Sequence, residues 1–192
     1  MAAIFSTLLG ALLGGISGFL VSLWTNRQTQ RMALTQALVE EFLSASFMEH
    51  RISVSKTRRK LEDGTVTAAA LAGGFWYPGD AGFYAGETFG LLNEHQHLGV
   101  FLEFLIRVDR VLTRKLADQS DLSVSLSDKL VWYRDLSTAV AEETARQATE
   151  AGVPVPHWVG AASRVFRQLN VSHQGELQAG LPSLPGSAEA AE

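Results

Sequence analysis

The sequence predicts a mostly α-helical protein, with one N-terminal transmembrane helix followed by a small cytoplasmic helical bundle. Three observations predict this fold class. The chain carries no charged residue from Ala2 to Trp24. Large apolar residues recur at spacings of three and four residues along several later segments, which is typical of amphipathic helices. Proline and glycine clusters separate those segments.

The uncharged N-terminal segment is long enough to cross a membrane. About 23 helical residues extend roughly 35 Å, against a hydrocarbon core of about 30 Å. A cleaved signal peptide would need a basic start, yet no Lys or Arg precedes Arg27. Because Arg27 and Arg31 follow the segment, the positive-inside rule places the rest of the chain in the cytoplasm. We therefore expect residues 1–24 to anchor a single-pass protein in the lipid bilayer of a bacterial inner membrane.

Small residues recur at every fourth position of this segment, so they share one face of a helix. The candidate oligomerisation face comprises Ser6, Gly10, Gly14, Gly18 and Ser22. Small side chains let helix backbones approach closely in lipid, which favours a homo-oligomer or packing against another membrane helix. The alternative is that these glycines are ordinary, because glycine is common in membrane helices.

Residues 25–62 form an expected juxtamembrane helical region, which the Asp63-Gly64 turn signal ends. No Pro or Gly interrupts Thr25 to Leu61, so the first helix can continue into this region. Its expected apolar face comprises Leu34, Leu38, Phe42 and Ala45. A basic cluster follows at Arg51, Lys56, Arg58, Arg59 and Lys60. That cluster fits contact with anionic lipid or nucleic acid, or simply a solvated helix face.

Residues 63–174 are expected to form the helical domain. The apolar period predicts helices over 98–116 and 125–149, and a short last helix from about Pro156. The expected core residues are Leu98, Phe101, Leu105, Val108, Leu112, Leu116, Leu126, Leu130, Tyr133, Leu136, Val140, Val159, Phe166 and Leu169. Arg107, Arg110 and Arg114 should stay exposed, with Glu103 four residues before Arg107 as its partner. Residues 175–192, rich in Gly, Pro, Ser, Ala and Glu, predict a disordered tail.

Glycine and aromatic residues crowd the stretch from Gly73 to Gly86, which predicts a loop. Its candidate ligand or partner residues are Phe75, Trp76, Tyr77, Asp80, Phe83 and Tyr84. Aromatic loops can hold ligands, but their rings can equally fold back onto the core.

The remaining composition argues against several kinds of chemistry. The chain has no cysteine, so it has no disulfide framework and no thiolate zinc site. His95 and His97 lack the spacing of a helical metal pair, and would serve as ligands with Glu94 only in a loop. The serines at 123, 125 and 127 resemble capping residues rather than nucleophiles. With a net charge of −4, no nucleic-acid partner is expected, and no catalytic residue, metal or cofactor is predicted.

Two segments carry a resemblance to a known family. They are Arg31 to Arg51, with Glu41-Phe42-Leu43-Ser44 and Glu49-His50-Arg51, and Leu91 to Phe101, followed by a helix with Trp132. In these segments the chain resembles a bacterial family of short single-pass membrane proteins whose soluble domain has no known function. The resemblance covers about half the chain. It implies a membrane-tethered helical domain and assigns no activity.

Two classes of function follow. The first is a membrane-anchored, non-enzymatic interaction, scaffold or membrane-effector protein that self-associates through its small-residue stripe. The alternative is a membrane-tethered sensor or enzyme that binds a small ligand near the aromatic loop. No motif identifies a ligand, an oligomer number or a biological process.

Overall fold

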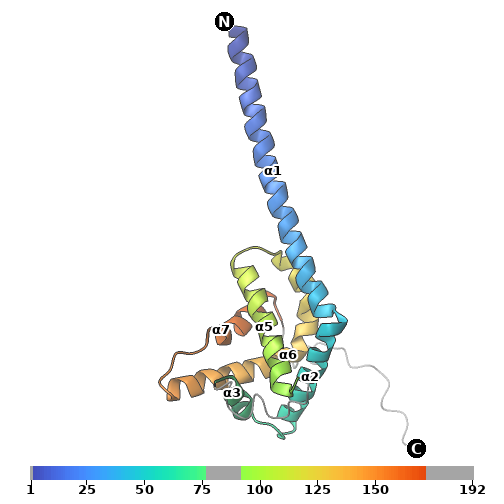
Figure 1. Cartoon of the computed structure of the whole chain (residues 1–192), viewed down its shortest axis with the longest axis vertical. Coiled ribbons are helices and arrows are strands. Elements are labelled where there is room, and N and C mark those ends of the chain that lie inside the picture. Colours follow the sequence, from blue (N-terminus) through green and yellow to red (C-terminus); the bar gives the residue numbers. More distant parts are fainter. Residues whose placement is uncertain (1, 77–91, 172–192) are drawn as a thin grey trace, which may run out of the picture.

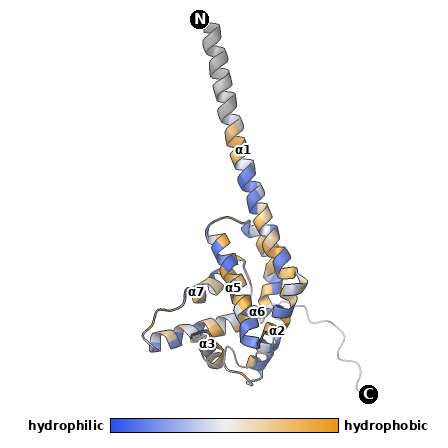
Figure 2. Cartoon of the chain, in the orientation of Figure 1, coloured by the Kyte–Doolittle hydropathy of each residue, from blue (hydrophilic) through white to orange (hydrophobic). Residues whose placement is uncertain are grey.

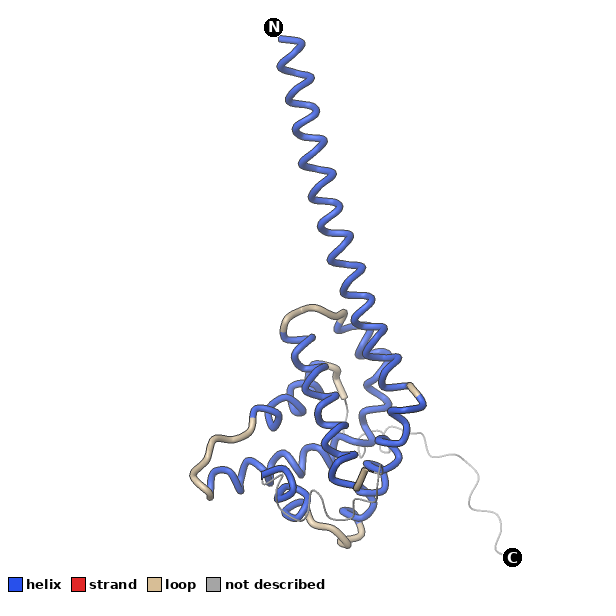
Figure 3. Tube along the Cα trace, in the orientation of Figure 1, coloured by secondary structure: helices blue, strands red, loops and turns tan. Residues whose placement is uncertain are grey.

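The computed structural model describes residues 2–76 and 92–171, and it describes side chains from Ser17 onward except at 74 and 76. The described elements are α1 (Ala2–Leu43), α2 (Ala45–Glu62), α3 (Ala68–Trp76), α5 (Glu94–Thr113), α6 (Gln119–Glu150) and α7 (His157–Gln168). The described residues contain no strand, which confirms the predicted helical class (Figure 3).

Helix α1 extends far beyond the bundle formed by the other helices (Figure 1). Its continuity from Ala2 to Leu43 confirms that the first segment continues into the region 25–62. The helix stops at Ser44, which the sequence did not predict. There the Ser44 hydroxyl accepts a hydrogen bond from the Phe47 N–H at 3.1 Å and so caps α2.

The predicted membrane location is contradicted. In the part of the chain that the structure describes, no helix is both long enough and apolar enough to cross a membrane. Within α1, the described stretch from Ser17 to Asn26 carries no charge. Hydrophilic residues follow it (Figure 2). The prediction that residues 1–24 anchor a single-pass protein with a cytoplasmic domain is therefore wrong.

Helices α5 and α6 form the centre of the bundle. Helix α5 packs against α2, α3 and α7, and α6 packs against α1, α2, α3 and α7. The predicted core is confirmed at Leu98, Phe101, Leu105, Val108, Leu112, Leu126, Leu130, Tyr133, Leu136, Val140, Phe166 and Leu169, which are all buried. Leu116 is instead 42% exposed, because α5 ends at Thr113 and Lys115 takes a left-handed conformation (φ 55°).

Both central helices begin earlier than their apolar period predicts, because polar residues cap them. Asn93 and Gln96 form a reciprocal capping box that starts α5 at Glu94. The Asp118 carboxylate accepts hydrogen bonds from the N–H groups of Ser120 and Asp121, and α6 starts at Gln119. The serines at 123, 125 and 127 thus lie inside α6, and their prediction as caps was wrong.

An aromatic cluster joins the end of α1 to the bundle. The Phe42 ring is fully buried, with its centroid 5.4 Å from that of Phe104 and 5.7 Å from that of Phe47. Tyr133 of α6 meets it edge-on at 6.4 Å, and the Arg51 guanidinium lies 4.9 Å from its centroid. Three other helices, α2, α5 and α6, therefore contact this one side chain of α1.

Ion pairs cross several helix contacts. Arg107 binds Glu41 of α1 through two hydrogen bonds, so the predicted partner, Glu103, was wrong. Arg164 of α7 binds both carboxylate oxygens of Asp109 at 2.8 and 2.9 Å. A planar guanidinium holding a carboxylate at two points fixes the angle between two helices.

Part of the predicted aromatic loop is helical. Residues 73–76 belong to α3, because Leu71 and Ala72 are buried and the Thr67 hydroxyl accepts a hydrogen bond from the Ala70 N–H at the start of the helix. Residues 77–86 lie outside the described residues, as does the predicted tail at 175–192.

Candidate functional site

The described side chains of α1 before Thr35 form an exposed surface. Every residue from 17 to 34 is exposed, and Thr35 is the first buried residue among the described side chains of the helix. Large apolar side chains stand in this stretch at 42–67% exposure: Phe19, Leu20, Val21, Leu23 and Trp24. They surround most of the helix, whereas a surface helix normally confines its apolar residues to one stripe.

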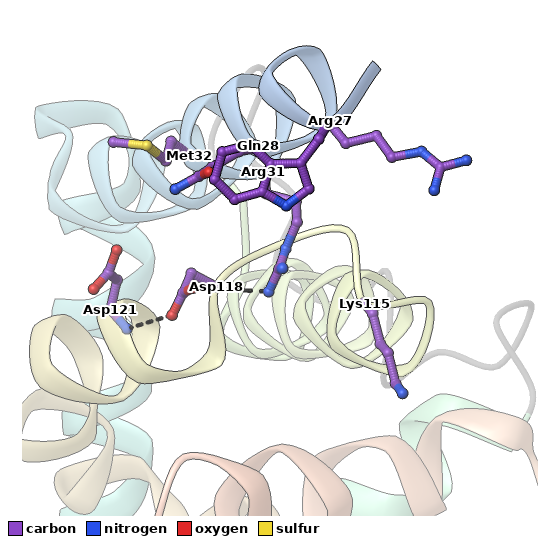
Figure 4. A pocket seen from close by; sticks show the side chains of 8 residues that line it. Arg27, Gln28, Arg31, Met32, Lys115, Asp118 and Asp121 are labelled. Carbon is purple, nitrogen blue, oxygen red and sulfur yellow. Dashed lines mark hydrogen bonds and ion pairs between the residues drawn. The ribbon is translucent and has the colours of Figure 1, made fainter. Parts of the chain in front are cut away.

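A cleft of about 640 Å³ lies where α1 leaves the bundle (Figure 4). Helix α1 lines it with Trp24, Arg27, Gln28, Arg31 and Met32. The α5–α6 turn adds Lys115 and Asp118, and the first turn of α6 adds Asp121. The Arg31 guanidinium lies 3.7 Å from the Asp118 carboxylate and donates to the Ala117 carbonyl at 3.4 Å. Asp118 is thus occupied by a cap and an ion pair, so this cleft supports the direction of α1.

A second hollow, of about 550 Å³, lies between α3, α5 and α7. We call it the Phe75–Trp158 groove; its lining comprises Phe75, Leu92, Gln96, Gly99, Val100, Leu102, Glu103, Ile106 and Trp158. The Phe75 and Trp158 ring centroids are 5.6 Å apart, at an interplanar angle of 59°. The groove is mostly apolar and carries one carboxylate, a composition typical of small-ligand sites.

Two histidines from different helices face each other across the α2–α5 contact. The Nδ1 atoms of His50 and His97 are 2.9 Å apart, so one imidazole donates and the other accepts. Burial, followed by the nearby charge of His97, lowers the pKa of His50 below 6.5, and Glu49 partly opposes this. This hydrogen bond requires one Nδ1 atom to be unprotonated, so it is lost if both imidazoles are protonated.

The predicted metal alternative does not form. Glu94, His95 and His97 all lie on α5 rather than in a loop, and Glu94 binds Lys60 at 2.6 Å. Among the residues that the structure describes, no three side chains of the metal-binding types come together.

The predicted oligomerisation face is only partly described. Gly18 and Ser22 are exposed on α1, and a Cβ at Gly18 would have no heavy atom within 4 Å. Ser6, Gly10 and Gly14 fall in the helical stretch without described side chains. Packing within the monomer therefore does not require a glycine at position 18.

The predicted ligand loop is also divided. Phe75 is half-buried and lines the Phe75–Trp158 groove. Trp76 ends α3 without a described side chain, and Tyr77, Asp80, Phe83 and Tyr84 lie outside the described residues. Trp158 was not predicted as a site residue, because a single tryptophan at a helix start carries no ligand signal in the sequence.

Comparison of the chain with protein-family models, curated proteins and solved structures found no match. The resemblance of residues 31–51 and 91–101 to a family of membrane proteins stays an expectation from the sequence alone.

Proposed function

We propose that this chain is a non-enzymatic interaction protein whose bundle holds α1 outward as an arm for association with α1 of a second copy. One observation carries the proposal: every described residue from 17 to 34 is exposed, including several large apolar side chains. Residues 2–34 would form an arm about 50 Å long at 1.5 Å per residue.

Association would remove apolar surface of the arm from water. Phe19, Leu20, Val21, Leu23 and Trp24 are about half exposed or more. Burying such side chains completely contributes about 1.5–3 kcal/mol each, so covering the exposed parts of Phe19 and Val21, which flank the Gly18–Ser22 side, gains on the order of 4–8 kcal/mol over the two copies. Association costs about 4–15 kcal/mol. The described stretch alone gives marginal binding.

Gly18 provides the sharpest test. A leucine at 18 meets nothing in the monomer and improves helix propensity by up to about 1 kcal/mol, so the fold should be retained. In a helix pair that approaches along the Gly18–Ser22 side, the same leucine would hold the backbones apart. Leu20 lies about 200° around the helix from Gly18, so Leu20→Phe adds bulk to the opposite side and serves as the control.

Sedimentation velocity of the full chain from 1 to 100 µM would measure the association. We expect concentration-dependent dimers for the wild type and Leu20→Phe, and a shift toward monomer for Gly18→Leu. A wild-type chain that is monomeric at every concentration, or that is recovered as a monomer on lipid vesicles, would refute the proposal. Equal dimer content in all three proteins would remove the Gly18 face from the contact.

A second candidate function is the binding of a small ligand in the Phe75–Trp158 groove. The specific observation that favours it is a mostly apolar hollow of about 550 Å³ with two aromatic rings at its wall, next to part of the sequence expected to hold a ligand. Saturation-transfer NMR with a library of small aromatic compounds would test it. If every compound that binds the wild type fails to bind the Gly99→Leu variant, the binding site is the groove.

A further inference from the structure

The charged side chain in the described lining of the Phe75–Trp158 groove is acidic. Among the described residues, its lining contains seven apolar or aromatic residues, the Gln96 amide and the Glu103 carboxylate, but no Lys, Arg or His. Gln96 is 9% exposed and is bound in the capping box, where it accepts a hydrogen bond from the Asn93 N–H. Glu103 is therefore the acidic side chain that the described lining offers to a ligand.

The Glu103 carboxylate has no ion pair or hydrogen bond with any side chain or backbone group that the structure describes. The basic residue four positions later, Arg107, binds Glu41 of α1 instead. On α7, Arg164 is held at two points by Asp109. Both arginines are thus engaged elsewhere, and among the described residues no cation pairs with Glu103.

The aromatic wall adds a second preference for positive charge. Phe75 from α3 and Trp158 from α7 lie with their centroids 5.6 Å apart, and both rings are only half-buried. The faces of aromatic rings carry partial negative charge and attract cations within about 6 Å, with tryptophan the strongest of the side chains. A ligand in contact with the apolar wall would meet both the rings and the carboxylate.

We propose that the Phe75–Trp158 groove binds lipophilic organic cations, with Glu103 selecting for the positive charge and the Phe75 and Trp158 rings holding the apolar body. The proposal rests on the second candidate function, ligand binding in this groove. An anion of the same shape is repelled by Glu103. A neutral compound of the same shape gains the apolar contact and lacks the attraction.

Two substitutions separate the groove from its charge. A Cβ at Gly99 would lie 3.6 Å from the Phe75 ring, which is an ordinary contact, so Gly99→Leu fills the groove while the helix is kept. Glu103→Gln removes the charge and keeps the shape. Glu142→Gln on α6 makes the same change in net charge at an exposed position away from the groove and is the matched control.

Three probes of similar shape measure the selectivity by isothermal titration calorimetry on the full chain. They are tetraphenylphosphonium (a cation), tetraphenylborate (an anion) and triphenylphosphine oxide (neutral). We expect tetraphenylphosphonium to bind with a Kd on the order of 10–100 µM, as a drug-sized apolar ligand can, and tetraphenylborate at least tenfold more weakly. Glu103→Gln should weaken the cation about fivefold or more and leave the neutral probe unchanged, whereas Glu142→Gln should change neither.

The outcomes distinguish ligand binding in the groove from selectivity for cations. Gly99→Leu should abolish binding of the cation, and quenching of tryptophan fluorescence by the cation should be lost in Trp158→Phe. Equal affinity for all three probes, or no effect of Glu103→Gln, would overturn the cation selectivity and leave ligand binding standing. Unchanged binding in Gly99→Leu, or no binding of any probe, would overturn both. Circular dichroism of each variant establishes that its helices are intact.

Discussion

Truncation of Phe42 tests whether α1 is a structural part of the bundle or only attached to it. Phe42→Ala removes a fully buried ring that lies against Phe104, Phe47 and Tyr133. Replacing a buried phenylalanine by alanine typically costs about 3–5 kcal/mol, since burial is lost and a cavity remains. Three aromatic neighbours from three other helices place the expected loss of unfolding free energy near the upper end, at about 4–5 kcal/mol.

Leu43 provides a control one residue further along the same helix. Its side chain is 45% exposed, so Leu43→Ala should change the free energy of unfolding by about 0.5 kcal/mol or less. Urea unfolding of both variants, followed by circular dichroism, measures the difference. For a chain of this size, 1 kcal/mol shifts Tm by about 2–4 °C, so Phe42→Ala should melt about 8–20 °C lower. A loss below 1 kcal/mol for Phe42→Ala, or equal losses at both positions, would refute the packing of α1 on the bundle.

Three further predictions concern the α2 region and its neighbours. Because the folded pKa of His50 lies below its unfolded value, the unfolded chain binds the proton first, and the free energy of unfolding should fall as pH drops from about 7.5 to 5.5. Urea titrations should show a shallower fall in His50→Gln and an unchanged one in the exposed His157→Gln; equal slopes in all three would contradict the role of the His50–His97 contact. Ser44→Ala should lower the unfolding free energy by about 0.5–2 kcal/mol, with loss of the α2 cap, and an unchanged urea midpoint would speak against it. Gly64→Ala should destabilise by about 1–2 kcal/mol through its φ of 77° alone, since a Cβ there meets no atom within 4 Å; a gain in stability would show that the turn adopts another conformation.

The periodic positions of the central helices were predictable, and the helix ends were not. The three- and four-residue spacing identified Leu105 on α5 and Leu130 on α6 as core residues, because a helix facing a core repeats its apolar positions in this way. Ser44 and Asp118 were not recognised as caps. Capping depends on where the backbone stops being helical, and the packing of neighbouring helices sets that point.

The partners of charged and site residues were also beyond sequence reasoning. Arg107 was paired with Glu103 by spacing, but it binds Glu41, which lies 66 residues away. A spacing rule weighs only neighbours on one helix, whereas the bundle brings α1 within reach of α5. The same reasoning placed ligand binding in the aromatic loop, and the described groove combines Phe75 with Trp158 of α7.

The amino-acid sequence by itself determined that the chain is helical and which residues of the central helices face the core, because both follow from propensity and period within one helix. It did not determine the location of the protein, and the predicted span at residues 1–24 is contradicted. Only the tertiary structure decided that Glu103 is left without an ion pair among the described residues and that two aromatic rings share a groove with it. Those features depend on the relative placement of α1, α3, α5 and α7, and long-range packing sets that placement.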